Sequence, residues 1–245
     1  GTMNPAWPSV MLLLAAGAAQ ADDADKLQAL GGGVFTKGGV VAEINLNRSK
    51  ITDDQLKLIS GFGHLTDLSL EQTKIGDAGL AHLTDLAKLE WLNLFGTQVG
   101  DTGLVHLAKL PKLQHLPIGE TRVTDAGMAH IAKMKRLVYL GLRGNKIGDA
   151  AVAHLAKLPK LTGLHLGETG ITDKGAEALA ALGQLQKLWL NDTRLTDASV
   201  PCLAKLKRLQ SLYLHRTRLT IEGVRRLQKA LPKCQIFYRS ATVPE

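Results

Sequence analysis

The chain has 245 residues, of which 45% are hydrophobic and 21% are charged, a composition typical of a folded protein with a sizeable core. Its two cysteines, Cys202 and Cys234, are too few for a disulfide-stabilised scaffold, and their spacing excludes the common Cys/His metal modules. The net charge of +8 fits a nucleic acid, an anionic surface or an acidic partner, and equally a solvated exterior, so the placement of the charges must decide.

The first 21 residues have the pattern of a secretory signal. An apolar run over residues 9–19 is too short to span a bilayer, AQA at 19–21 is a small-x-small cleavage pattern, and the charged DDADK follows. We therefore expect residues 1–21 to be a signal peptide, and the mature protein to be secreted or periplasmic. Gly1 and Thr2, ahead of Met3, are typical of residues left by cloning. No Lys or Arg precedes the apolar run, so an apolar helix covering the end of the domain remains an alternative.

Two short end segments flank the main part of the chain. Residues 22–40 predict an N-terminal cap, with a short helix in DDADKLQALGG and a strand before a Gly turn. Residues 234–245 predict a C-terminal cap strand in CQIFYRS, with Cys234 in a buried position, followed by a loose tail. Between them, residues 41–233 form the repeats described next.

A 24-residue repeat dominates the sequence. Leucine recurs at this interval, and Val41 extends the series backwards, giving eight units over residues 41–233 with the last longer by one residue. The leucines are Leu65, Leu89, Leu113, Leu137, Leu161, Leu185 and Leu209. Positions within a unit are numbered from these residues.

Each unit predicts a short strand followed by a short helix. The first half, LxxLxL, alternates apolar and polar residues at its end, as a strand with one buried face does. The second half has apolar residues at positions 16, 19 and 22, the stripe of a helix buried on one side. Asp at position 13 suits an N-cap or first helical turn, and Thr at position 9 suits a side chain that satisfies backbone groups where the strand ends.

Stacked units bury a continuous core that one unit alone cannot form. Adjacent parallel strands lie ~4.8 Å apart whereas packed helices need ~8–10 Å, so the array must bend toward its strand side. We therefore predict an α/β solenoid, a right-handed horseshoe with parallel strands on the concave side and short helices on the convex side.

The repeat resembles that of leucine-rich repeat proteins, of the ribonuclease-inhibitor-like subtype. It is most similar to bacterial members built on LxxLxLxxTxITDxGLxxLxxL, as in LTGLHLGETGITDKGAEALAAL, and the likeness covers residues 41–233. It departs from the commonest pattern of the family in having Thr where Asn or Cys is usual. The resemblance implies a recognition scaffold without naming a ligand.

Candidate binding residues lie in the strand columns that face the hollow, positions 3, 5 and 7. Five of the six aromatic residues between 41 and 233 fall in these columns, together with histidines and an arginine. Aromatic residues favour strands in general, but Trp, Tyr and Arg are also the usual anchors of interfaces. We expect a concave binding face in two parts, with Gly119, Gly141, Gly163 and Gly167 leaving a shallow zone between and around them. The N-terminal part comprises Trp91, Phe95, His115 and Tyr139, and the C-terminal part comprises His165, Trp189, Tyr213 and His215. The predicted binding residues are Trp91, Phe95, His115, Tyr139, Arg143, His165, Trp189, Tyr213 and His215.

The histidines at position 18 are not expected to do chemistry. His82, His106, His130 and His154 recur in consecutive units on the convex side, where helices ~8–10 Å apart hold imidazoles too far apart to share a metal. The sequence has no GxSxG, P-loop, HExxH or GxGxxG motif in its required context. We therefore predict no catalytic residues, no metal and no cofactor.

Positive charge lies outside the concave columns. In six of the eight units position 10 holds Lys or Arg, along the rim where the strands end, and positions 21 and 24 add further cations. Acidic residues such as Glu71, Glu120, Glu168 and Asp192 lie beside the position-10 column, so we expect much of this charge to be paired or solvated. We do not expect nucleic-acid binding.

Two functions remain open. The first is a non-enzymatic, monomeric scaffold that binds a protein or peptide through its concave face, since rigid curvature lowers the ordering cost of binding. The alternative is an envelope-associated scaffold that binds polysaccharide or another anionic polymer through concave aromatic residues and the basic rim. Strong weakening of binding by modest salt would favour the polymer.

Overall fold

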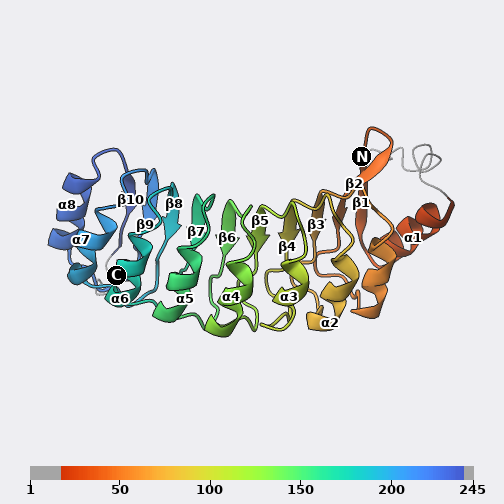
Figure 1. The fold of residues 1–245 in the computed structure, drawn as a ribbon, viewed down its shortest axis with the longest axis horizontal. Coiled ribbons are helices and arrows are strands. Elements are labelled where there is room, and N and C mark those ends of the chain that lie inside the picture. Colours follow the sequence, from red (N-terminus) through yellow and green to blue (C-terminus); the bar gives the residue numbers. More distant parts are fainter. Residues whose placement is uncertain (1–17, 240–245) are drawn as a thin grey trace, which may run out of the picture.

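The computed structural model describes residues 18–239, which form one ten-stranded sheet with the strands in chain order. The strands lie side by side along the length of the molecule, and the short helices line the other side (Figure 1). The right-handed horseshoe predicted from the repeat is thus confirmed as the fold. The strands are β1 (Gly33–Lys37), β2 (Val40–Asn45), β3 (Asp67–Ser69), β4 (Trp91–Asn93), β5 (His115–Pro117), β6 (Tyr139–Gly141), β7 (Gly163–His165), β8 (Lys187–Trp189), β9 (Ser211–Tyr213) and β10 (Gln235–Phe237).

The helical segments of the convex side are short. The α-helices are α1 (Ala18–Ala29), α2 (Asp77–Leu80), α3 (Leu104–Leu107), α4 (Met128–Ile131), α5 (Asp149–Leu155), α6 (Asp173–Leu179), α7 (Val200–Leu203) and α8 (Ile221–Ala230). The 3₁₀ segments are η2 (Asp54–Ile59), η3 (Ala81–Leu83), η4 (Asp125–Gly127) and η5 (Asp197–Ser199). Within residues 18–239 none of these has both the length and the apolar character needed to cross a bilayer.

Residues 24 positions apart in the sequence pair with one another on neighbouring strands of the sheet. Leu68 on β3 pairs with Leu92 on β4, and Leu116 on β5 pairs with Leu140 on β6. All four leucines are fully buried. They belong to one apolar core that runs from Ala24 to Cys234, because each unit covers the apolar face of the next.

The N-terminal end is closed by α1 and by the antiparallel hairpin of β1 and β2. The predicted boundary after Ala21 falls inside α1, and residues 1–17, which hold most of the predicted signal sequence, lie outside the described part of the chain. At the other end, Cys234 is buried next to β10, as expected, and both cysteine thiols are free.

A left-handed backbone residue ends each strand. Position 8 has a positive φ in every unit, with Gly in only two of them (Gly96 and Gly144) and a polar or charged residue in the others. At the next position, threonine donates a hydrogen bond from its hydroxyl to a backbone carbonyl three residues earlier. The buried Thr169, for example, donates to the carbonyl of Leu166 at 2.6 Å. The prediction for position 9 is therefore confirmed, since the threonine satisfies a backbone acceptor where the strand ends.

The position-13 aspartates join neighbouring repeats. Asp149 is the first residue of α5, but its carboxylate accepts hydrogen bonds from the backbone N–H of Thr172 at 2.8 Å and from the Thr172 hydroxyl at 2.6 Å, one repeat further on. Thr172, at position 12, is the residue that caps α6. Of the two roles expected for position 13, the place in the first helical turn is confirmed, whereas the N-cap is the residue before it. The carboxylate instead reaches the backbone donors that the next repeat offers.

Glycine at position 15 makes room for this contact. A Cβ atom on Gly175 would lie 2.5 Å from Oδ1 of Asp149, and one on Gly103 would lie 2.5 Å from Oδ1 of Asp77. The Asp–Gly pattern of the repeat is therefore an inter-repeat clamp, defined here as the contact between the position-13 carboxylate and positions 12 and 15 of the following unit.

Candidate functional site

The nine predicted binding residues all lie half-buried on or next to the concave face. Six of them belong to strands β4 to β9, whereas Phe95, Arg143 and His215 follow their strands directly. They point away from the core because the alternating residues of the same strands are its buried leucines. The strand pattern thus places every predicted residue on one side of the sheet.

Four rings form a continuous stack at the C-terminal half of this face. His165, Trp189, Tyr213 and Phe237 occupy the same register position on β7, β8, β9 and β10. Their centroids are 5.3, 5.3 and 4.4 Å apart, and successive planes differ by only 6°, 8° and 5°. The strand spacing of ~4.8 Å is close to the stacking distance of aromatic rings, so a parallel sheet aligns such a column face to face. We call these four residues the aromatic ladder.

Tyr139 extends the aromatic ladder from a neighbouring column. Its ring lies edge-on to Trp189, with centroids 6.2 Å apart and planes at 87°. A Cβ atom on Gly163 would lie 2.9 Å from Cδ2 of Tyr139, and one on Gly141 would lie 3.0 Å from its hydroxyl. The two glycines therefore provide the space in which the tyrosine ring lies.

The predicted division of the face into two parts is wrong in its details. Tyr139 was assigned to the N-terminal group but packs with the C-terminal one. The rings of Phe95 and His165 lie 3.1 and 2.8 Å from where a Cβ of Gly119 and Gly167 would be, so aromatic side chains lie directly beside these glycines. Neighbouring side chains lean into the space that a missing Cβ leaves free. Among the described residues, Trp91, Phe95 and His115 make no ring contact with one another.

Phe237 was not among the predicted residues. With Cys234 taken as the first residue of a new unit, Phe237 would fall at the fourth, buried position. In the structure Gln235 pairs with Ser211, 24 residues earlier, so Phe237 pairs with Tyr213 at position 5. The pairing step from β9 to β10 is therefore 24 residues, so the eighth unit is not longer by one residue as predicted, and a fixed 24-residue count from Tyr213 would have found the phenylalanine.

The aromatic ladder carries no charge at neutral pH. Burial lowers the pKa of His165 to about 4, with a further contribution from the positive charge of Arg143 and an opposing one from Glu168. Burial also raises the pKa of Tyr139 above its usual value. Both rings are therefore neutral near pH 7, and the ladder presents an apolar surface.

Ion pairs border the aromatic ladder on the side where the strands end. Arg143 lies between two carboxylates, 2.8 Å from Glu168 and 3.9 Å from Glu120. Arg216 holds Asp192 with two hydrogen bonds of 2.5 and 2.6 Å, which keeps the pKa of Asp192 below its usual value. Glu120, Glu168 and Asp192 thus pair with arginines at positions 7 and 8 and not with the position-10 cations, whereas Glu71 accepts a hydrogen bond from the side-chain amide of Asn93 at 3.0 Å. The guanidinium of Arg143 is already engaged and so is less available to a ligand than predicted.

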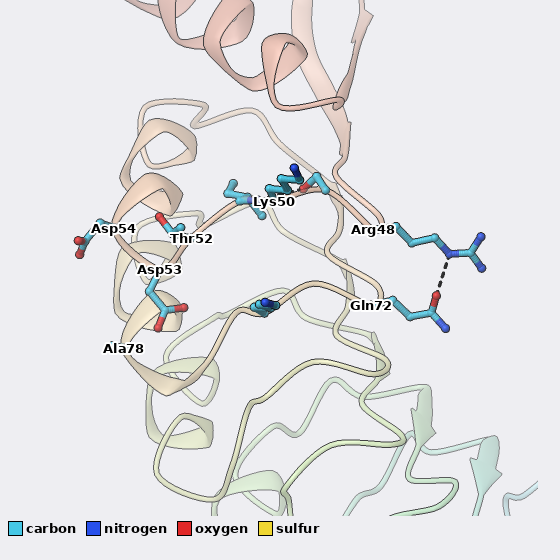
Figure 2. A pocket seen from close by; sticks show the side chains of 10 residues that line it. Arg48, Lys50, Thr52, Asp53, Asp54, Gln72 and Ala78 are labelled. Atoms are coloured by element: carbon cyan, nitrogen blue, oxygen red, sulfur yellow. Dashed lines mark hydrogen bonds between the residues drawn. The ribbon is translucent and has the colours of Figure 1, made fainter.

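A separate hollow of about 910 Å³ lies near the N-terminal end, where β2 and β3 lead into their helical segments. Figure 2 shows Arg48 and Gln72 extending to one side, joined by a hydrogen bond of 2.7 Å, and Asp53 and Asp54 lying at the other. Its lining mixes charges of both signs, and the carboxylate of Asp53 already accepts from the backbone of the next repeat at 2.8 Å. The hollow contains none of the nine predicted residues.

The position-18 histidines lie half-buried on the helical side, away from the aromatic ladder. Adjacent helical segments pack against one another on this side. Over residues 18–239, no three His, Cys, Asp or Glu side chains are grouped so that they could hold a metal ion.

Comparison with known proteins places this arrangement in a family. Residues 45–244 match the family described as "Leucine-rich repeat region". No curated protein matches the chain. Among solved structures, an internalin C2 from Listeria monocytogenes is 20% identical with a TM-score of 0.66, over 93% of this chain and 96% of the internalin.

A second solved structure is larger. The leucine-rich repeat ectodomain of the Arabidopsis receptor kinase HAESA, in complex with an N-terminally extended IDA peptide hormone, is 18% identical with a TM-score of 0.66. The match covers 91% of this chain but only 42% of that ectodomain. At these identities the two structures show the shared fold, and the family match covers most of the chain. The protein therefore belongs to the leucine-rich repeat family.

Proposed function

We propose that this protein is a non-enzymatic recognition scaffold that binds a protein or peptide through its concave face. The observation that carries the proposal is the aromatic ladder of His165, Trp189, Tyr213 and Phe237. These rings are half-buried and lie on the concave side of the sheet. They are not needed in the core, because the leucine columns already fill it. Large, partly exposed aromatic side chains of this kind are typical anchors of protein interfaces.

The packing of the rings favours a protein or peptide over a polymer that stacks. Each inner ring of the ladder has both faces covered by its neighbours, so that ring edges form an apolar ridge. Sugar rings and nucleobases bind aromatic side chains through free ring faces, which the two inner rings, Trp189 and Tyr213, do not offer. Apolar side chains of a peptide can pack against the ring edges, because such packing requires an ordered apolar surface and no free ring face. Because the stack is already ordered, binding costs little conformational entropy.

Further parts of the proposal rest on other observations. The HAESA ectodomain binds a peptide hormone on a scaffold of the same fold, which supports a peptide ligand here by analogy. Export to the periplasm or exterior is supported by the signal-like pattern of residues 1–21 and by these extracellular neighbours. The repeat pattern supports the ribonuclease-inhibitor-like subtype and a bacterial source, and we take the protein to be monomeric.

The test uses peptides selected from a random library on the purified full chain. Their affinities are then measured for wild type, for Trp189→Ala combined with Tyr213→Ala, and for two controls. Trp91→Ala removes an aromatic residue of the same face outside the ladder, and Val105→Ala removes an exposed apolar residue of α3. Circular dichroism and unfolding midpoints establish that each variant is folded at the assay temperature.

The expected result is loss of at least tenfold in affinity for the ladder variant and less than threefold for both controls, since hot-spot aromatic residues contribute about 2 kcal/mol or more. Equal binding by the folded ladder variant would refute the proposal. So would an equal loss in Trp91→Ala, because the anchor would then not be the ladder.

A further inference from the structure

The turns that lead from each helix to the next strand carry an unusual concentration of positive charge. The turns 108–114, 132–138 and 156–162 belong to three consecutive repeats and together contain seven Lys or Arg residues and no acidic residue. We call the Lys and Arg side chains of these three turns the basic edge. They lie at the opposite end of the strands from the position-10 rim and outside the aromatic ladder.

The fold forces these side chains outward. In the middle turn, Met134 and Leu137 are buried in the core, and the residues between and before them, Lys133, Lys135 and Arg136, are exposed. The same pattern of apolar anchors holds in the turns on either side. Exposure of the basic edge therefore follows from the repeat and does not depend on a particular side-chain conformation.

Backbone hydrogen bonds hold the three turns at the spacing of a sheet. The amide of Val138 donates to the carbonyl of Gln114 at 2.8 Å, and the amide of Thr162 donates to the carbonyl of Val138 at 2.9 Å. Successive turns therefore lie about 5 Å apart where they enter their strands. Lys135 also reaches the next turn, where its amine donates to the carbonyl of Lys157 at 3.0 Å. The turns that carry the cations thus follow one another along the axis on which the repeats stack (Figure 1).

Within the described part of the chain, no carboxylate pairs with the basic edge. All the ion pairs found there involve other cations, namely Lys26, Arg143, Arg216, Arg225 and Arg226. The position-10 cations also form no ion pair in this part of the chain, but two of them, Lys50 and Lys74, line the same pocket as Asp53 and Asp54. Like charges on turns that enter their strands about 5 Å apart repel one another, since the screening length is ~8–10 Å, and a bound polyanion reduces that repulsion.

We propose that the basic edge binds a linear polyanion, a flexible chain carrying regularly spaced phosphate, sulfate or carboxylate groups. A chain of this kind matches a row of cations that runs straight across consecutive repeats. The edge consists mostly of lysines, which act as hydrated point charges, and its three turns contain no aromatic residue. It therefore offers neither the stacking platforms that single-stranded nucleic acids use nor an apolar anchor for a lipid bilayer.

The experiment measures binding of long-chain polyphosphate to the full chain over a series of salt concentrations. The test variant combines Lys109→Gln, Lys112→Gln, Lys133→Gln and Lys160→Gln and leaves Lys135, which makes a backbone contact, in place. The control variant combines Lys50→Gln, Lys74→Gln, Arg122→Gln and Lys146→Gln. It removes the same charge from the position-10 rim. Vesicles rich in phosphatidylserine and single-stranded DNA are titrated in parallel.

Wild type is expected to bind polyphosphate. The slope of the logarithm of the binding constant against the logarithm of the salt concentration should become smaller in magnitude by about four in the test variant, roughly one per cation removed. In the control variant it should change by less than about two. Binding that drops equally in both variants would mean a response to net charge and would overturn the proposal. It would also be overturned by absence of polyphosphate binding at low salt, or by tighter binding to vesicles or to single-stranded DNA. Because the variants leave the aromatic ladder intact, selected peptides should bind both of them like wild type.

Discussion

His165 should make the stability of the protein depend on pH. Its imidazole lies in the aromatic ladder against Trp189, and burial lowers its pKa from the usual 6.5 to about 4. Between these two values the unfolded chain binds a proton that the folded chain does not, so the free energy of unfolding falls as the pH falls from 6.5 toward 4. The difference between the two pKa values corresponds to at most about 3.4 kcal/mol. Because the ring is only partly buried and water screens its charge, we expect about 1–2 kcal/mol.

Urea unfolding at a series of pH values, followed by circular dichroism, measures this contribution. The control is His165→Phe, which keeps an aromatic ring in the stack but cannot titrate. The difference in unfolding free energy between wild type and this variant should change by about 1–2 kcal/mol between pH 6.5 and 4 and stay level above pH 7. A flat difference over the whole range, or an NMR titration of His165 with a pKa of 6.5 or higher, would refute the assigned burial of the ring.

Further predictions concern packing and the clamp between repeats. Leu140→Ala, in a fully buried column of β6, should lower the unfolding free energy by ~2–5 kcal/mol, and a loss below 1 kcal/mol would contradict its burial. Asp149→Ala removes both hydrogen bonds to Thr172 and should cost about 1–3 kcal/mol, whereas Asp149→Asn should cost less. Gly163→Val should displace the ring of Tyr139 and weaken selected peptides with little change in circular dichroism, and unchanged affinity would show that Tyr139 does not contribute.

The repeat was predictable because its causes are local and periodic. Leucines at fixed intervals define which side of each strand and helix is buried, and the pairing of Leu68 with Leu92 confirms the 24-residue step. The role of Thr169 at the end of β7 was also predictable, since its hydroxyl reaches a carbonyl three residues earlier. Such contacts join residues of the same unit, so the number of residues between the partners can be read from the sequence.

The contacts between units were harder to predict. Asp149 was assigned to its own helix, but its partner Thr172 lies 23 residues further on. Arg143 was taken as a free ligand-binding residue, but it pairs with Glu168 of the next repeat. In both cases several partners were compatible with the sequence, and only the stacking of the repeats selected one of them.

The sequence by itself determined the family, the order of the strands and which columns lie on the concave side. When the leucines of a strand face the core, the residues that alternate with them must face the opposite side of the sheet. Only the tertiary structure decided that His165, Trp189 and Tyr213 form a ladder together with Phe237. The rings meet because backbone hydrogen bonding fixes neighbouring strands at a distance close to that of stacked rings. Aromatic residues at one repeat position indicate only which rings are candidates for stacking. Their contacts depend on the register of β10 and on the space that Gly141 and Gly163 leave for Tyr139.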